Sequence, residues 1–284
     1  MKKLLGLLLT VLLVGLVLIG CGGDDTADGD FTVVTVGVVG AFQDQWDAVN
    51  AALYDEGIRV ELVHFTEWTL PNPALNDVEI DLNAFQSTVF LNNAIESNGY
   101  DLAIVGNTFV SPMNVFNGRL DISANPDRAS LLPYIEDGTV VGLPSDPVNL
   151  GRALKVLEAA ELIELDPAVG FLGTEVDITN FHVELELVLA EANTLPQLLP
   201  DLDIAVINAP QALTNGLSAR VESLFREDAL NVDISDGLVN VIVSRAGAEN
   251  DPVFQRIAEA YQTQAVADVF EHVFDGAFIP AWTQ

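Results

Sequence analysis

One segment of the chain, residues 144–154, carries polar groups in a pattern that could hold a small anion. It reads Pro-Ser-Asp-Pro-Val-Asn-Leu-Gly-Arg-Ala-Leu and follows the apolar stretch Thr139–Leu143. Asn149 is a residue type that caps helices, and Arg152 would then lie in the first turn, where the positive helix end disfavours a cation. Free backbone amides and a guanidinium at one place form a site for carboxylate or phosphate. The alternative is an exposed Arg152 paired with one of the many acidic residues, and the spacing alone favours neither.

The single cysteine, Cys21, follows a segment that is first charged and then apolar. Lys2 and Lys3 precede an uncharged stretch over residues 4–19, which is somewhat shorter than the ~20 residues of a membrane-spanning helix. The small Gly20 directly before the cysteine is typical of the site at which lipoproteins are cleaved and lipidated. We therefore expect residues 1–20 to be a signal peptide and a diacylated Cys21 to anchor the protein on the extracytoplasmic side of the cell membrane. An uncleaved anchor helix that ends by chance in Gly-Cys is the alternative.

The composition limits the partners of the mature protein. The formal net charge is −31, and removal of Lys2 and Lys3 with the signal peptide would make it −33. Such a surface repels nucleic acid and anionic lipid, so we expect no nucleic acid as partner and no membrane contact beyond the lipid anchor. Residues 21–30 are rich in Gly and Asp and would form a flexible tether. The roughly 255 residues that follow are long enough to favour two lobes over one.

Residue types that serve catalysis or metal binding are present but scattered. The three histidines are His64, His182 and His272, and the chain contains no Gly-x-Ser-x-Gly sequence. A hydrolase needs a nucleophile beside a base, and a zinc or redox site needs spaced Cys and His residues. We therefore expect no catalytic residues, no metal and no cofactor.

Apolar stretches typical of strands alternate with stretches of helical spacing. The predicted strands are Phe31–Val39, Ile58–Phe65, Asp101–Val105, Thr139–Leu143, Val183–Leu187, Asp203–Asn208 and Leu238–Val243. The predicted helices are Phe42–Glu56, Ser87–Asn98, Leu150–Ala160 and one or two helices within Pro252–Phe274. This alternation indicates an α/β fold with largely parallel sheets. Ligands of such sheets bind beyond the carboxyl ends of strands, which directs attention to the residues after Val63, Val105, Leu143 and Ile207.

Ordered blocks over most of the chain share a pattern with one known family. The blocks are Phe65–Trp68 with Pro71-Asn72, Ile80–Gln86, Val105–Phe109, Pro144–Leu154, Ala205–Asn208 and Gly276–Ala281. Together with the signal-like segment before them, they resemble the NlpA-type lipoproteins, the methionine-binding components of ABC importers.

The resemblance implies a fold and a function. The fold would be of the type II periplasmic-binding-protein kind, with two α/β lobes, a hinge that the chain crosses twice and a ligand cleft between the lobes. Lobe one would comprise residues 31–112 and 235–284, and lobe two residues 113–234. The protein would be a monomer and not an enzyme, and would deliver a free amino acid, methionine before others, to an ABC permease and its ATPase. The alternatives are the same fold with another small ligand, such as a different apolar amino acid or a short peptide, or a surface or structural lipoprotein without a transport role.

The resemblance also assigns ligand-binding residues. Arg152 would bind the ligand carboxylate with Asn149 beside it, and Asn208 and Asn240 would orient the carboxylate and the ammonium group. The residues assigned to the side-chain pocket are Trp68, Phe85, Ser87 and Phe90. The aromatic residues could instead belong to an ordinary core, and Asn208 and Asn240 could simply end strands.

Three of these pocket positions depart from the family pattern. The family commonly has His directly after the Phe-Gln pair and Tyr three residues later, where this chain has Ser87 and Phe90. Trp68 stands where Tyr is usual. Two polar groups are thus lost and a larger ring is introduced, so we expect branched or aromatic ligand side chains to be tolerated better than the family pattern implies.

Overall fold

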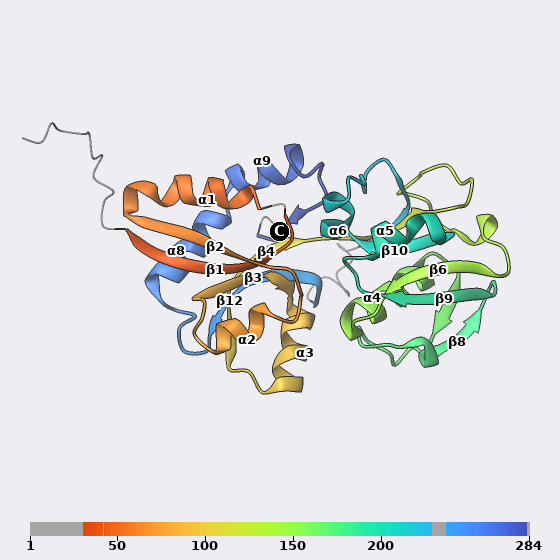
Figure 1. Ribbon diagram of the computed structural model, residues 1–284, viewed down its shortest axis with the longest axis horizontal. Coiled ribbons are helices and arrows are strands. Elements are labelled where there is room, and N and C mark those ends of the chain that lie inside the picture. Colours follow the sequence, from red (N-terminus) through yellow and green to blue (C-terminus); the bar gives the residue numbers. More distant parts are fainter. Residues whose placement is uncertain (1–30, 42, 229–236, 283–284) are drawn as a thin grey trace, which may run out of the picture.

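The computed structural model describes residues 31–41, 43–228 and 237–282, which form two lobes side by side (Figure 1). The predicted signal peptide, Cys21, the tether and the predicted lobe boundary at residues 234–235 lie outside the described residues. Within the described ranges, no helix has the length and apolar character needed to cross a membrane.

Strands and helices alternate along most of the described chain. The strands are β1 (Thr32–Val39), β2 (Ile58–Phe65), β3 (Leu82–Ser87), β4 (Leu102–Val110), β5 (Met113–Asn117), β6 (Thr139–Pro144), β7 (Ile163–Leu165), β8 (Ile178–Phe181), β9 (Leu185–Ala190), β10 (Ile204–Asn208), β11 (Ser223–Arg226), β12 (Val239–Arg245) and β13 (Ile279–Pro280). The α-helices are α1 (Gln45–Leu53), α2 (Pro71–Asn76), α3 (Thr88–Asn98), α4 (Pro147–Ala159), α5 (Leu195–Leu198), α6 (Ala209–Thr214), α8 (Pro252–Tyr261) and α9 (Gln264–His272). Short 3-10 helices span Tyr54–Glu56, Leu132–Tyr134, Glu175–Asp177 and Leu199–Asp201. The predicted two-lobed α/β fold is confirmed.

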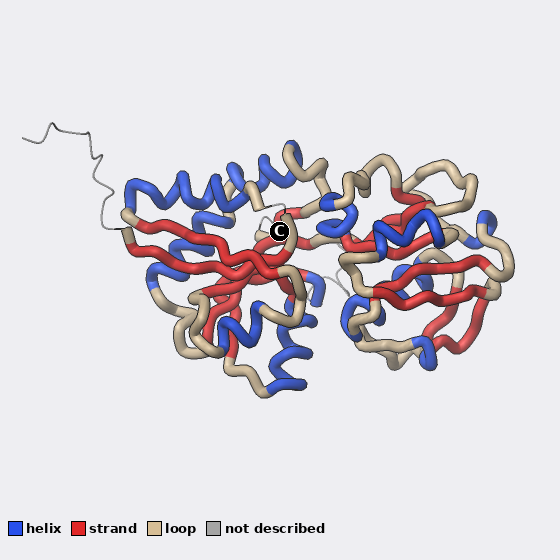
Figure 2. The backbone as a smooth tube through the Cα atoms, in the orientation of Figure 1, coloured by secondary structure: helices blue, strands red, loops and turns tan. Residues whose placement is uncertain are grey.

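The first lobe is built on a six-stranded sheet with the order β13-β4-β12-β3-β1-β2. Alternate residues of β12 face two separate apolar cores, as the two-residue period of a strand requires. Ile242 packs with residues of α1, α8 and α9, whereas Val241 and Val243 pack with residues of α2 and α3. Helices therefore cover both faces of this sheet (Figure 2).

The second lobe is built on a five-stranded sheet with the order β11-β5-β10-β6-β9, beside the small sheet β7-β8. Its central strand β10 is buried along its whole length. Ile204 and Val206 pack on the side of α4, and Ala205 and Ile207 pack on the side of α5 and α6. The carboxyl end of β10 is thus held rigidly, and Asn208 is its last residue.

The chain passes between the two sheets twice. β4 ends at Val110 and β5 begins at Met113, so the first crossing is the dipeptide Ser111-Pro112. The second crossing follows β11 and begins with Glu227 and Asp228. β12 enters the first sheet after this crossing and runs antiparallel to both β3 and β4. The prediction of largely parallel sheets is wrong, because a strand that arrives from the other lobe needs no helical crossover on its own sheet.

Most predicted elements are present, although their first or last residues differ from the prediction. The difference that matters most for the site is the start of α4. This helix begins at Pro147, and Asp146 caps it by accepting a hydrogen bond from the backbone N–H of Asn149 at 3.0 Å. Proline in the first helical position and an aspartate before it are a favourable helix start. The prediction that Asn149 caps this helix is wrong, and Arg152 lies in the second turn rather than the first.

Candidate functional site

A cavity lies between the lobes where several strands end. First-lobe strands contribute Val39 at the end of β1 and Ser87 at the end of β3, and Asn208 at the end of β10 contributes from the second lobe. Such convergence of strand ends is the usual place for a ligand in an α/β fold. All of the residues assigned to ligand binding from the sequence line this cavity: Trp68, Phe85, Ser87, Phe90, Asn149, Arg152, Asn208 and Asn240. Their role in binding stays a prediction, although the fold brings them to one place.

Arg152 is the only charged side chain among the described residues that line the cavity. Its Nε atom donates to the two carboxylate oxygens of Glu227 at 2.8 and 3.1 Å, and its Nη2 atom donates to the same carboxylate. Nη2 also donates to the backbone carbonyl oxygen of Ser111 at 2.5 Å. The side chains of Arg152 and Glu227 are only 7% and 8% exposed. Arg152 therefore pairs with an acid, but it is buried and not exposed as that alternative expected. It also lines the cavity, and its role in an anion site stays a prediction.

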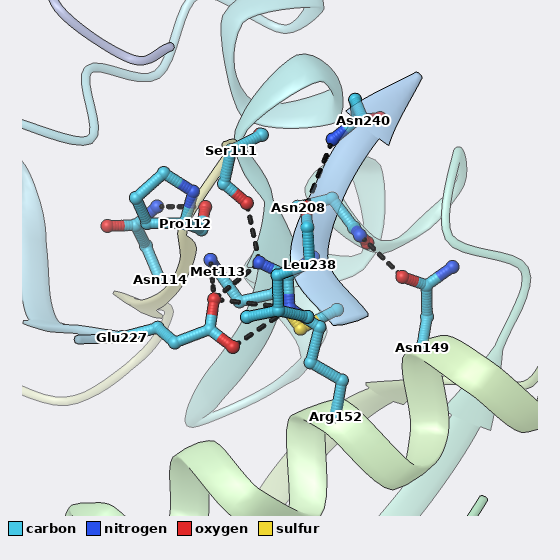
Figure 3. Close-up of polar contacts among 10 residues, drawn as sticks. All are labelled: Ser111, Pro112, Met113, Asn114, Asn149, Arg152, Asn208, Glu227, Leu238 and Asn240. Carbon is cyan, nitrogen blue, oxygen red and sulfur yellow. Dashed lines mark hydrogen bonds and ion pairs between the residues drawn. The ribbon is translucent and has the colours of Figure 1, made fainter. Parts of the chain in front are cut away.

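Glu227, in the second crossing, ties Arg152 to Met113, the residue that directly follows the first crossing (Figure 3). Its Oε2 atom also accepts a hydrogen bond from the backbone N–H of Met113 at 2.8 Å, and its own backbone N–H donates to the Met113 carbonyl at 2.9 Å. A buried carboxylate is tolerated when a cation and N–H donors compensate the lost water. Glu227 was not among the predicted site residues, because nothing in the local sequence distinguishes it from the other members of a set of 42 acidic residues.

Three asparagine side chains from different elements line the cavity together with Arg152 (Figure 3). Asn208 Nδ2 donates to Asn149 Oδ1 at 2.7 Å, and Asn149 Nδ2 donates to Asp146 Oδ2 at 2.9 Å. Asn240, on β12, donates through Nδ2 to the carbonyl oxygen of Leu238 at 3.5 Å. These amides place neutral donors and acceptors in the same cavity as one guanidinium, an arrangement that suits a group carrying both charges.

Two polar atoms at this end of the cavity, both buried, have no hydrogen-bond partner in the described part of the chain. They are Asn208 Oδ1 and Ser111 Oγ. Leaving a buried polar atom unpaired is unfavourable by about 1–3 kcal/mol. A ligand that supplies a hydrogen-bond donor to Asn208 Oδ1 would remove this penalty.

The other end of the cavity is aromatic. Trp68 follows β2, Phe85 lies on β3, and Phe90 lies in the first turn of α3. The ring centroids of Trp68 and Phe85 are 6.0 Å apart, those of Trp68 and Phe90 6.5 Å, and those of Phe85 and Phe90 5.9 Å. Rings at these distances attract one another in tilted and edge-on arrangements. Ser87 caps α3, because its Oγ atom accepts from the backbone N–H of Phe90 at 3.4 Å.

A buried network of amide side chains supports this aromatic end. Asn72 Nδ2 donates to Gln86 Oε1 at 2.8 Å, and Gln86 Nε2 donates to Asn72 Oδ1 at 2.7 Å and to Asn83 Oδ1 at 3.0 Å. Asn83 Nδ2 donates to Asn72 Oδ1 at 2.9 Å. Phe85 lies between Asn83 and Gln86 in the sequence of β3, so this network holds the strand from which its ring projects.

The histidines do not take part in this site. His64, His182 and His272 are on the surface and none lines the cavity. Among the residues that the structure describes, no group of three or more His, Cys, Asp or Glu side chains could hold a metal ion. The side chains that do line the cavity can bind and orient a small molecule through one guanidinium, amides and aromatic rings.

The chain is similar to known proteins over nearly its whole length. It matches the family described as NlpA lipoprotein over residues 34–282. It is 35% identical over 276 residues to Lipoprotein 28 of Escherichia coli strain K12, which covers 96% of this chain and 95% of that protein. It is 36% identical over 271 residues to the D-methionine-binding lipoprotein MetQ of the same strain, which covers 94% of each. Its structure is similar to that of a nutrient-binding protein from Burkholderia cenocepacia bound to methionine, with a TM-score of 0.77, 28% identity, and coverage of 87% of this chain and 99% of that chain.

Proposed function

The chain belongs to the NlpA lipoprotein family, and we propose that it is the substrate-binding lipoprotein of an ABC importer, with a free amino acid as ligand and methionine first among the candidates. The observation that carries this proposal is the interlobe cavity, which has a buried guanidinium and amides at one end and three aromatic rings at the other. The ligands named for the E. coli and Burkholderia relatives support it.

The polar end of the cavity would bind the zwitterionic part of the amino acid. The carboxylate would bind to Arg152 beside Asn149, and the ammonium group would donate to Asn208 Oδ1, which lacks a partner within the described structure. Asn240 would complete the set from the first lobe. A ligand with one positive and one negative group then finds both a cation and neutral acceptors, so neither of its charges is buried without compensation.

The aromatic end would bind the side chain of the amino acid. Thioether sulfur against aromatic rings contributes about 0.3–1.5 kcal/mol per contact, which favours methionine. An apolar pocket discriminates by only about 1–3 kcal/mol per methylene, so we expect methionine to exceed leucine by tens of fold at most. Glutamate and lysine should be rejected, because Trp68, Phe85 and Phe90 offer no countercharge to a buried ion.

Binding would close the two lobes and so signal to a membrane permease. The cavity is lined by residues of both lobes, so a ligand in it binds the closed arrangement better than an open one and shifts the population toward it. Small-angle scattering should show a smaller radius of gyration with ligand. An unchanged profile at saturating ligand would favour the alternative of a surface lipoprotein without a transport role.

Attachment to the extracytoplasmic side of the membrane through Cys21 is part of this proposal. The support is the apolar N-terminal segment that ends in Gly20-Cys21. Replacing the only cysteine, Cys21→Ala, should abolish metabolic lipid labelling. Normal labelling in this variant would contradict the assignment of Cys21.

A thermal-shift screen of the twenty amino acids, with methionine in both its L and D forms, tests the proposed ligand class. A ligand that binds only the folded protein raises the unfolding temperature, and the rise grows with the logarithm of the ligand concentration divided by its Kd. We expect the largest shift with methionine, smaller shifts with leucine and other apolar amino acids, and none with glutamate or lysine. A response only to an acidic or basic amino acid, or to a sugar, would contradict the assignment of the two ends of the cavity.

A further inference from the structure

Most hydrogen-bond donors of the Arg152 guanidinium are already engaged inside the protein. Nε carries one N–H and Nη2 carries two, and Nη1 carries the remaining two. Nε donates to Glu227, and Nη2 donates to both Glu227 and the Ser111 carbonyl oxygen. The edge formed by Nε and Nη2, which could hold a carboxylate side-on, is therefore occupied by Glu227. A ligand carboxylate in the cavity has Nη1 as its available partner on Arg152.

Glu227 is not placed to leave Arg152 when a ligand arrives. Arg152 lines the interlobe cavity, whereas Glu227 does not and lies behind the guanidinium. Its carboxylate also accepts from the backbone N–H of Met113, and its backbone N–H is bonded to the Met113 carbonyl. Releasing it would leave a buried carboxylate without its cation, which is strongly unfavourable.

The pair sets the charge that a ligand meets. Arg152 is the only charged side chain among the described lining residues, and Glu227 directly behind it carries the opposite charge. The Arg152–Glu227 pair at the polar end of the cavity is thus formally neutral. A zwitterion adds no net charge to this buried place, whereas an anion of the same shape would bring an uncompensated negative charge close to the Glu227 carboxylate.

We propose that Glu227 is a positioning residue that fixes Arg152 by its Nε–Nη2 edge and, by neutralising it, makes the cavity select zwitterions over anions with the same side chain. This inference rests on the proposed function. It adds a specificity determinant that does not touch the ligand, because Glu227 acts only through Arg152 and through its charge.

The test compares methionine with γ-(methylthio)butyrate, which is methionine without its amino group and is an anion at neutral pH. Calorimetric titration of both ligands gives a selectivity ratio for wild type and for the Glu227→Gln variant. Wild type should prefer methionine, and Glu227→Gln should lower the ratio by about tenfold or more, because removal of a buried charge a few ångströms away changes the binding of a net anion far more than that of a zwitterion. A loss of general packing would weaken both ligands alike and leave the ratio unchanged.

The chain offers a control that matches the geometry in a second Arg–Glu pair, which is more exposed. Glu56 accepts from Arg256 Nε at 2.9 Å and from Arg256 Nη2 at 2.7 Å, in the same side-on geometry, and neither residue lines the cavity. Glu56→Gln should leave the selectivity ratio at the wild-type value. Glu227→Asp, which keeps the charge on a shorter side chain, should weaken both ligands and hold the ratio within about threefold of wild type, because its charge is retained.

The outcomes separate this inference from the proposed function. Failure of wild type to bind methionine would contradict the proposed function itself. If wild type binds methionine, an unchanged ratio in Glu227→Gln or a wild-type preference for the anion overturns the role of Glu227. Should Glu227→Gln not fold, Glu227→Asp and the wild-type ratio decide, and a collapsed ratio in Glu227→Asp contradicts the proposal.

Discussion

The two ends of the cavity are held in different ways. At the polar end, Arg152 is fixed by directional hydrogen bonds to Glu227 and to the Ser111 carbonyl oxygen, and these partners belong to the two crossings between the lobes. At the aromatic end, Trp68 and Phe90 are half-buried rings that contact each other and Phe85 without directional bonds between them. The first arrangement has one geometry, whereas the second can repack at small cost. The polar end should therefore determine the class of ligand. The aromatic end should only set the relative affinities of ligands with different side chains within that class.

The largest loss of methionine affinity is expected when Arg152, at the polar end, is replaced. Arg152→Ala should weaken methionine binding by about 2–5 kcal/mol, because a buried ligand charge loses its partner. Arg152→Lys should recover only part of the loss, since an ammonium group cannot bind Glu227 side-on and still present a planar N–H to a ligand. Calorimetry measures both values, after near-ultraviolet circular dichroism has shown that the variants fold. Unchanged affinity in both variants would remove Arg152 from the site.

A smaller effect is expected at the aromatic end. Trp68→Ala should weaken methionine binding by about 1–2 kcal/mol, because one sulfur–aromatic contact and part of the ring surface are lost. Trp68 suits this test because it is half-buried, whereas Phe85 is 6% exposed and its truncation would also destabilise the lobe. Trp68→Ala should change the ranking of amino acids in a thermal-shift screen more than Arg152→Lys does. An affinity loss as large as that of Arg152→Ala would contradict the contrast between the two ends.

Replacing Asn208 tests whether this residue of the polar end accepts a hydrogen bond from the ligand ammonium group. Asn208→Ala should weaken methionine by about 1 kcal/mol, because it removes the acceptor proposed for the ammonium group and the 2.7 Å bond to Asn149. The anion γ-(methylthio)butyrate has no ammonium group, so its affinity should fall less. Titration of both ligands measures the difference, and equal losses would show that Asn208 acts only by supporting Asn149.

The smallest effect is expected from restoring a polar group that the family commonly has. Phe90→Tyr adds one hydroxyl to a ring whose centroid lies 5.9 Å from that of Phe85. This variant should change methionine affinity by less than about 1 kcal/mol. Leucine should lose more than methionine, because the added polar group makes the pocket less apolar. A change of ten times or more in methionine affinity would mean that the aromatic end is as strictly built as the polar end.

The sequence, through its family resemblance, predicted two lobes and eight of the residues that line the cavity, but not the geometry at Arg152. The edge strand β2, which was predicted with the observed bounds Ile58–Phe65, follows from the local apolar pattern alone. The start of α4 was misplaced because Asp146 and Asn149 are both good capping residues and lie three positions apart. Only the folded chain shows that Asp146 caps the helix.

The partner of Arg152 could not be predicted for a different reason. Glu227 is 75 positions away in the sequence, and the two meet because the second crossing returns beside the first. Local pattern carries no information on such long-range pairing. The same holds for the antiparallel placement of β12 between β3 and β4, which depends on the path of the chain between the lobes.

A crystal structure of the protein with bound L-methionine tests the central claim most directly. The account predicts that the ligand carboxylate contacts Arg152 Nη1 while Glu227 stays on Nε and Nη2, that the ammonium group contacts Asn208 Oδ1, and that the thioether lies among Trp68, Phe85 and Phe90. A ligand in the opposite orientation, or a carboxylate that has displaced Glu227 from Arg152, would contradict it.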